Sequence, residues 1–170
     1  MRKKRNEGVD PKLWEAARTI SARLNKEDIA HALIGGLAVS HYGFERATRD
    51  VDFLVTPDAM EILTGRPTTI GFTEREGTVK IDYMITDAWE EFLEDAIENS
   101  KDSERGVPVI PVEALIYLKL LANRRKDQLD IIELIRGGIS VKNVRSYLEH
   151  LNDPDFLAAF DLHVREADEP

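Results

Sequence analysis

The chain of 170 residues is long enough for one domain, or for one domain with a helical extension, and its 42% hydrophobic content suffices for a buried core. Its formal net charge of −9 disfavours binding to polyanions through the overall field. The absence of cysteine excludes a disulfide framework and a thiolate metal site, and no apolar run approaches the roughly 20 residues of a membrane span. The basic start leads into polar residues, which is unlike a signal peptide, so we expect a soluble cytoplasmic protein.

The first two-thirds of the chain predict helices that alternate with short strands. A helix is expected from Pro11 to about Asn25, with Asp10 as its N-cap, because apolar residues recur there at helical spacing. The elements expected next are a strand at 29–34, a short helix at 37–42, a strand at about 50–56, a helix from 57 to near 65, strands at 68–72 and 78–85, a helix from Asp87 to about Asn99, a polar loop at 100–106 and an extended piece at 107–110.

The last third of the chain predicts helices only. They are expected at 111–124, 126–136, 141–151 and 154–167, with turn residues between them. The expected fold class is therefore α+β, with a small mixed β-sheet flanked by helices and a helical C-terminal part. We expect residues 1–110 to form the α/β core with its N-terminal helix. Residues 111–170 are expected to pack on this core as one compact unit, because no long linker separates the two parts.

A glycine pair interrupts the segment Leu33–Val55, which reads LIGGLAVSHYGFERATRDVDFLV. Gly35 and Gly36 follow an apolar strand and open a helix, where bare backbone N–H groups can face an anion. The other interpretation is a tight strand-to-helix turn, which the glycine pair taken alone favours. The segment also lacks the third glycine of the dinucleotide fingerprint and the Gly-Lys-Ser/Thr ending of a P-loop, so both of those interpretations are disfavoured.

Three aspartates form a candidate metal site. Asp50 and Asp52 lie two apart on an expected strand, so both carboxylates point to one face. Asp82 lies in a later alternating segment, on the face opposite to the apolar residues of its strand. If the two strands are neighbours, the carboxylates converge, and such a cluster is costly without a cation. In a two-metal arrangement Asp50 and Asp52 would bind both ions, while Asp82 would bind the ion near the nucleophile and help to remove its proton.

Arg46 and Thr48 lie between the glycine pair and the first two aspartates, and together these residues form one spaced pattern. In chain order the set is Gly35, Gly36, Arg46, Thr48, Asp50, Asp52 and Asp82. The pattern resembles the nucleotidyltransferase (DNA polymerase beta-like) superfamily, and in particular its small prokaryotic members: the minimal nucleotidyltransferases, the antibiotic nucleotidyltransferases and the nucleotidyltransferase toxins. The segment 115–134 is similar to a helical pattern of many members, so the resemblance covers roughly residues 27–136.

The resemblance implies a Mg²⁺-dependent (or Mn²⁺-dependent) nucleotidyltransferase, which moves a nucleoside monophosphate from an NTP to a hydroxyl acceptor and releases pyrophosphate. It implies that Gly35 and Gly36 let the loop approach the β- and γ-phosphates. It also implies that Asp50, Asp52 and Asp82 are the catalytic residues and the metal ligands. The sequence departs from the usual Gly-Ser pair at Gly36, so no serine hydroxyl contacts phosphate at that position.

Three more residues are candidates for nucleotide binding. Lys119 is the sole charged residue in the apolar run 114–122, and a buried lysine needs an anionic partner. That partner is either the triphosphate or a core carboxylate, and the sequence favours neither. Arg46 either binds phosphate or braces the loop through an ion pair. The hydroxyl of Thr48 also suits a role in orienting the turn into the strand.

A basic cluster at 124–126 lies next to Asp127 and Asp130. It is interpreted either as a contact to the acceptor or nucleotide, or as a solvated helix junction in which Asp127 caps the next helix. The four histidines lack the spacing of a zinc site.

Two alternatives to an active enzyme remain open at this point. One is a catalytically inactive module of the same fold, which binds a nucleotide or serves as one half of a toxin–antitoxin pair. The other is a structural domain in which the three aspartates pair with Arg46, Arg49 and Lys80. The acceptor is equally open among a small molecule, a tRNA and a protein, and so are the preferred NTP and a possible homodimer or antitoxin partner.

Overall fold

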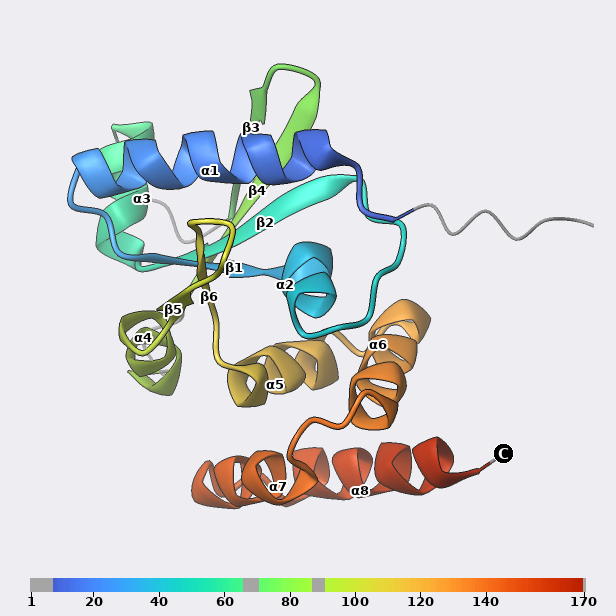
Figure 1. Ribbon diagram of the computed structural model, residues 1–170. Coiled ribbons are helices and arrows are strands. Elements are labelled where there is room, and N and C mark those ends of the chain that lie inside the picture. Colours follow the sequence, from blue (N-terminus) through green and yellow to red (C-terminus); the bar gives the residue numbers. More distant parts are fainter. Residues whose placement is uncertain (1–7, 66–70, 87–90, 170) are drawn as a thin grey trace, which may run out of the picture. The chain divides into compact units, whose positions relative to one another are not determined.

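The computed structural model describes residues 8–65, 71–86 and 91–169 of the chain (Figure 1). These residues form two compact units. One unit comprises the residues up to His41 together with Glu45–Ile110, and the other comprises Tyr42–Phe44 together with the residues from Pro111 onward. The described residues contain a run of alternating helices and strands followed by helices alone, which confirms the α+β fold class. The expectation that the two parts form one compact unit stays a prediction.

A mixed sheet forms the centre of the first unit (Figure 1). Within the described residues its strands are β1 (His31–Ile34), β2 (Asp50–Val55), β3 (Phe72–Glu76), β4 (Val79–Ile85), β5 (Lys101–Asp102) and β6 (Pro108–Val109), in the spatial order β3-β4-β2-β1-β6-β5. β2 is antiparallel to β1 and parallel to β4, and β6 runs parallel to β1. The edge strands β3 and β5 are antiparallel to their neighbours. The small mixed sheet predicted from the sequence is thereby confirmed.

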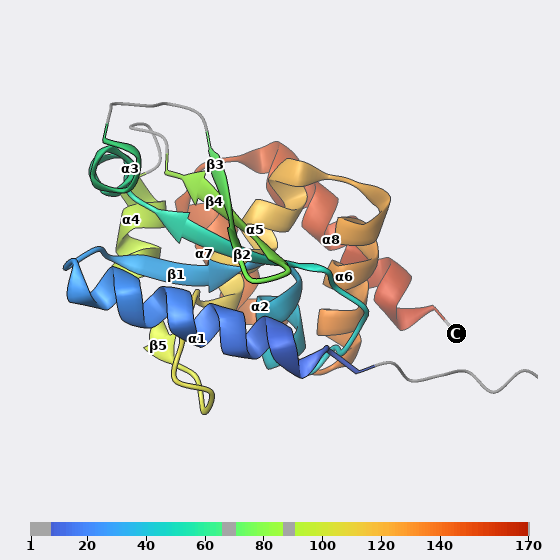
Figure 2. The same ribbon diagram turned by 90° about the horizontal axis from the view of Figure 1, so that it is seen from above.

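Helix α1 (Pro11–Lys26) lies against one face of this sheet (Figure 2). The helix begins where expected, because the Asp10 side chain accepts a hydrogen bond from the backbone N–H of Lys12 and Pro11 follows the cap. Its buried stripe includes Leu13, Trp14, Ala17, Ile20 and Leu24. Arg23 ties the helix to the sheet, since it donates hydrogen bonds to Glu74 on β3 and to the Tyr83 hydroxyl on β4.

Three shorter helices complete the described part of the first unit: α2 (Gly35–His41), α3 (Pro57–Thr64) and α4 (Glu91–Glu98). α2 follows β1 without an intervening loop, so the glycine pair lies within the first turn of the helix. α4 contacts β2. The chain therefore turns sharply at the end of β1, which places the glycine pair at one end of the sheet.

The second unit consists mainly of α5 (Val112–Ala122), α6 (Arg125–Arg136), α7 (Val141–His150) and α8 (Pro154–Asp168). Every residue of α5 from Ala114 to Leu120 is buried, as expected for a helix that is apolar on all faces. The end of α8 is held by the guanidinium of Arg136, which donates to the backbone carbonyls of Glu166, Ala167 and Glu169. Among the described helices, none has both the length and the apolar character needed to cross a bilayer.

Several predicted boundaries differ from those observed. The short helix expected at 37–42 begins at Gly35. The polar loop expected at 100–106 contains β5, because Lys101 pairs with Val109 of β6. The strand expected at 68–72 falls mostly on residues outside those described, and the observed strand at 72–76 was not expected because most of its residues are polar. The helix start predicted at Asp87 also lies outside the described residues.

Candidate active site

The parallel pairing of β2 with β4 brings the predicted aspartates together. In this register Asp52 lies opposite Asp82, and Asp50 lies opposite Lys80. Around the aspartates, at 50–53 of β2 and 79–83 of β4, half-buried and buried residues alternate, and the aspartates occupy half-buried positions. The condition set for their convergence, that the two strands are neighbours, is therefore met. Their roles as catalytic residues and metal ligands stay predictions.

Both oxygens of the Asp82 carboxylate are engaged. The Thr73 hydroxyl on β3 donates to Oδ1 at 2.6 Å, and the Lys80 ammonium donates to Oδ2 at 2.7 Å. Partial burial works to raise the pKa of Asp82, but the hydrogen bonds from Lys80 and Thr73 outweigh it and hold this pKa below its ordinary value. Asp82 is therefore ionised at neutral pH and held in one orientation.

Lys80 lies within the electrostatic influence of the whole acidic face. Its hydrogen bond to Asp82 is the main cause that raises the pKa of the lysine, and the charges of Asp82, Asp50 and Asp52 raise it further. The side chain is 43% exposed, so its ammonium is in contact with water. This ion pair is the one that the structural alternative predicted for Asp82.

The glycine pair is packed directly against the side chains of the candidate site. Gly35 has a φ of +67°, and a Cβ built on it would lie 2.1 Å from Oδ2 of Asp52. A Cβ on Gly36 would lie 2.5 Å from Oγ1 of Thr48. Any larger residue at either position would displace a side chain of the site. The glycines thus serve the geometry of Asp52 and Thr48, a reason that is independent of the predicted approach to phosphates.

A pocket of about 330 Å³ opens beside the aspartates. Its lining comprises Ile34, Asp52, Gly71, Asp82, Tyr83, Met84 and Ile85. Sequence reasoning singled out the two carboxylates and missed the rest of the lining. Their positions carried a signal, because Ile34 ends the strand before the glycine pair and Met84 follows Asp82 on the same face of β4. The pocket therefore combines two carboxylates with a largely apolar wall.

The donor set fits a hard divalent cation in its chemistry, since carboxylate oxygens are the ligands that Mg²⁺ and Mn²⁺ prefer. In the part of the chain that the structure describes, no three His, Cys, Asp or Glu side chains are already gathered as a metal site. The Lys80 ammonium is bound to Asp82 instead.

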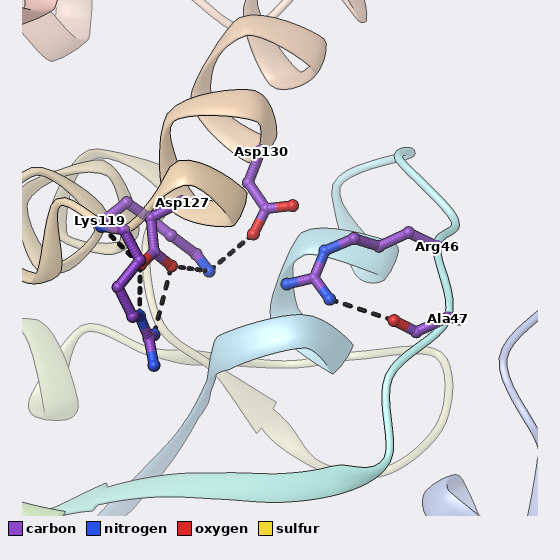
Figure 3. A network of polar contacts seen from close by, with 6 residues as sticks. Arg46, Ala47, Lys119, Asp127 and Asp130 are labelled. Atoms are coloured by element: carbon purple, nitrogen blue, oxygen red, sulfur yellow. Dashed lines mark hydrogen bonds and ion pairs between the residues drawn. The ribbon is translucent and has the colours of Figure 1, made fainter.

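Arg46 and Thr48 lie on the segment that leads into β2. The Arg46 guanidinium donates a hydrogen bond of 3.1 Å to the carbonyl of Ala47 (Figure 3). Thr48 lies against Gly36, which agrees with a role in orienting the turn. Contacts of either residue with a nucleotide stay predictions.

Lys119 lies in a buried ionic cluster of the second unit (Figure 3). Its ammonium donates to Oδ1 of Asp127 at 2.9 Å and to Oδ2 of Asp130 at 2.7 Å. The three side chains are 6%, 1% and 0% exposed, respectively. The structure thus shows the core-carboxylate partner that was one of the two expectations for Lys119, and the triphosphate contact stays a prediction.

Asp127 has a second cationic partner at the start of α6. The Arg124 Nε donates to Oδ2 of Asp127 at 2.7 Å, and the backbone N–H of Arg124 donates to the same oxygen at 3.2 Å. Burial raises the pKa of Asp127, but the hydrogen bonds from Arg124 and Lys119 lower it below its usual value. The interpretation that Asp127 caps the helix is confirmed.

Comparison with known proteins finds similarity of structure. No family model matches the sequence, and no curated protein matches it either. The crystal structure of an antigenic nucleotidyltransferase-like protein from Paracoccidioides brasiliensis matches with a TM-score of 0.53 at 17% identity, over 89% of this chain and 93% of that one. The crystal structure of ANT(2")-Ia in complex with adenylyl-2"-tobramycin matches with a TM-score of 0.52 at 15% identity, over 89% of this chain and 98% of that one.

Proposed function

We propose that this chain, whose fold is that of the nucleotidyltransferase-like proteins, transfers a nucleoside monophosphate from an NTP to a hydroxyl acceptor and releases pyrophosphate. The acceptor is a small molecule, a tRNA or a protein, and Mg²⁺ or Mn²⁺ is the cofactor. The observation that carries the proposal is the parallel register of β2 on β4, because it sets Asp52 opposite Asp82 on one face of the sheet. Gly35 adds a backbone turn that lies directly against the Asp52 carboxylate.

Each residue of the site has a role in the proposed reaction. Asp50, Asp52 and Asp82 would hold the metal, and the bound cation would supply positive charge to the phosphate oxygens and to the leaving pyrophosphate. The backbone of Gly35 and Gly36 would approach the β- and γ-phosphates, since neither residue has a side chain in the way. Catalysis would thus depend mainly on position and charge.

The chemical step exchanges one P–O bond for another. The acceptor oxygen attacks the α-phosphorus, a new O–P bond forms, and the bond from the α-phosphorus to the pyrophosphate oxygen breaks. The proton of the acceptor hydroxyl passes to the Asp82 carboxylate, which is ionised at neutral pH. The pocket beside Asp52 and Asp82 is the proposed acceptor site, because an acceptor there would have its hydroxyl next to this carboxylate.

An inactive module of the same fold is the second candidate, either as a nucleotide-binding domain or as a toxin–antitoxin component. The observation in its favour is the ion pair between Lys80 and Asp82, since one of the three aspartates already has a cationic partner. Such a module would not transfer a nucleotide.

Thermal unfolding with each of the four NTPs, with and without Mg²⁺, tests the proposal. A ligand that binds only the native state at one hundred times its Kd stabilises it by about 2.7 kcal/mol. We expect Mg²⁺-dependent stabilisation by at least one NTP and its loss in Asp52→Asn. Asp28→Asn is the matched control, because Asp28 is exposed and has a φ of +55°, which asparagine tolerates.

The outcomes separate the two candidates. An NTP shift that Asp28→Asn retains and Asp52→Asn loses supports the proposed site, and pyrophosphate release with acceptor fractions then identifies the acceptor. Stabilisation that survives in both Asp50→Asn and Asp52→Asn, without pyrophosphate release, would favour the inactive module.

A further inference from the structure

We propose that Lys80 is the resident counter-ion of the acidic face: its ammonium holds Asp82 in the metal-free protein and gives up this carboxylate when a divalent cation binds. The inference rests on the proposed function, because it takes Asp50, Asp52 and Asp82 as the metal ligands. It adds a residue that controls how readily the site accepts a metal. Lys80 is thus a positioning residue for Asp82.

The position of Lys80 supports the first half of the proposal. Lys80 and Asp82 lie two apart on β4, so both side chains stand on the same face, and the register sets Asp50 directly opposite Lys80. The ammonium is 2.7 Å from Oδ2 of Asp82. Carboxylates gathered on one sheet face repel one another, and a cation among them relieves this repulsion. Lys80 supplies that charge from within the chain.

The exposure of Lys80 supports the second half. The Lys80 side chain is 43% exposed and that of Asp82 is 29% exposed, so the ammonium can move into water without a burial cost. Lys119 makes the same kind of pair with Asp127, but there the side chains are only 6% and 1% exposed. The Lys80 pair can therefore open, whereas the Lys119 pair is enclosed by protein.

Thr73 keeps Asp82 in place while its partner changes. Its hydroxyl donates to Oδ1 at 2.6 Å, and Lys80 holds the other oxygen. When Lys80 leaves, Oδ2 becomes available and the carboxylate retains its orientation through Thr73. A divalent cation would then meet a carboxylate that Thr73 still holds, opposite Asp52 in the strand register.

Titration with Mn²⁺, followed by electron paramagnetic resonance of the free ion, tests the proposal in the absence of any nucleotide. We expect Lys80→Met to bind Mn²⁺ about tenfold more tightly than the wild-type chain, because a competing positive charge is removed. Lys80→Arg keeps the charge and is expected to stay within about twofold of the wild type. It also serves as the second variant if the methionine disturbs folding.

Arg75→Met is the matched control. Arg75 lies opposite Lys80 on β3, is exposed, and donates its hydrogen bond to the carbonyl of Thr78. Its replacement removes one positive charge from the same face without touching Asp82. We expect this variant to change the Kd for Mn²⁺ by less than about twofold, so that a larger effect in Lys80→Met reports the specific contact.

Crystal structures of the wild-type chain with Mn²⁺ and with EDTA provide a direct second measurement. The distance between Lys80 Nζ and the Asp82 carboxylate is expected to lengthen beyond hydrogen-bonding range when Mn²⁺ is bound. Unchanged or weaker Mn²⁺ binding by Lys80→Met, or an ion pair that persists beside the bound metal, would overturn the proposal.

Failure of this inference differs from failure of the proposed function. If the wild-type chain binds Mn²⁺ and Asp52→Asn does not, the metal site stands even where Lys80→Met has no effect. If neither the wild-type chain nor Lys80→Met binds Mn²⁺, both proposals are wrong.

Discussion

Two separate features of the structure require a glycine at position 35. Its φ of +67° lies in the left-handed region, which favours glycine, and the space where a Cβ would lie is taken by the Asp52 carboxylate. The sequence suggests two reasons for a glycine at this position, an approach to phosphate and a tight strand-to-helix turn. The structure adds that the residue is required by the fold of the site even before any ligand binds.

Gly35→Ala tests this double requirement against a matched glycine. Gly77 has a similar φ of +59°, but a Cβ there would meet nothing within 4 Å. Gly77→Ala is therefore expected to cost only the left-handed backbone, about 1–2 kcal/mol of unfolding free energy. We expect Gly35→Ala to cost more and to abolish Mg²⁺-dependent NTP stabilisation. If urea denaturation gives the same loss of unfolding free energy for Gly35→Ala and Gly77→Ala, the Asp52 side chain can move away from the new methyl group without cost.

His31 is a buried histidine with both ring nitrogens satisfied. Nδ1 donates to the Ile29 carbonyl at 2.8 Å, so Nε2 accepts from the Ser21 hydroxyl at 2.7 Å. Burial is the main cause that lowers the pKa of His31 below its ordinary value. The neutral ring is therefore part of the native structure, and protonation opposes folding.

The lowered pKa of His31 determines how the unfolding free energy depends on pH. The unfolded state takes up a proton at His31 near pH 6.5, whereas the native state does so only at lower pH, so the unfolding free energy falls as the pH drops below about 6.5. We expect that in His31→Gln the unfolding free energy, measured by urea titration, falls less between pH 7 and pH 5 than in the wild-type chain. His150→Gln, at an exposed position, is expected to leave it unchanged. A slope that persists in His31→Gln would assign the loss to other groups.

At the scale of elements, a buried ionic cluster joins α5 to α6. Lys119 on α5 binds Asp127 and Asp130 on α6, and all three side chains are nearly inaccessible to water. A buried ion pair contributes little net stability while it is intact, but the removal of one partner leaves an uncompensated charge. The packing of α5 against α6 is therefore expected to lose stability when Lys119 is removed.

Lys119→Met is expected to lower the unfolding free energy by about 3–5 kcal/mol at pH 7, because two buried carboxylates lose their shared partner. The matched control is Lys142→Met on α7, at an exposed position, for which we expect a change within about 0.5 kcal/mol. The cost at Lys119 should shrink as the pH falls through the carboxylate range. Urea unfolding followed by circular dichroism measures both effects, and a cost independent of pH would contradict the electrostatic cause.

Periodicity explains which elements were predictable. The alternation of β4 gave both the strand and the face of Asp82, and the apolar run of α5 gave a buried helix with one lysine in need of a partner. β3 was missed because an edge strand with mostly polar residues has little apolar pattern. The contact of Thr73 with Asp82 could not be predicted, because it depends on the register of β3 on β4, which local sequence does not encode.

At the scale of the whole molecule, Tyr42–Phe44 belongs to the helical unit, although the residues on both sides of it belong to the sheet unit. A ribosome makes this short segment long before it makes Pro111 and the helices that follow. A nascent chain that has reached only Ile110 therefore lacks the rest of the unit to which Tyr42–Phe44 belongs. We expect Tyr42–Phe44 to reach its native contacts only after the helices from Pro111 onward have been synthesised.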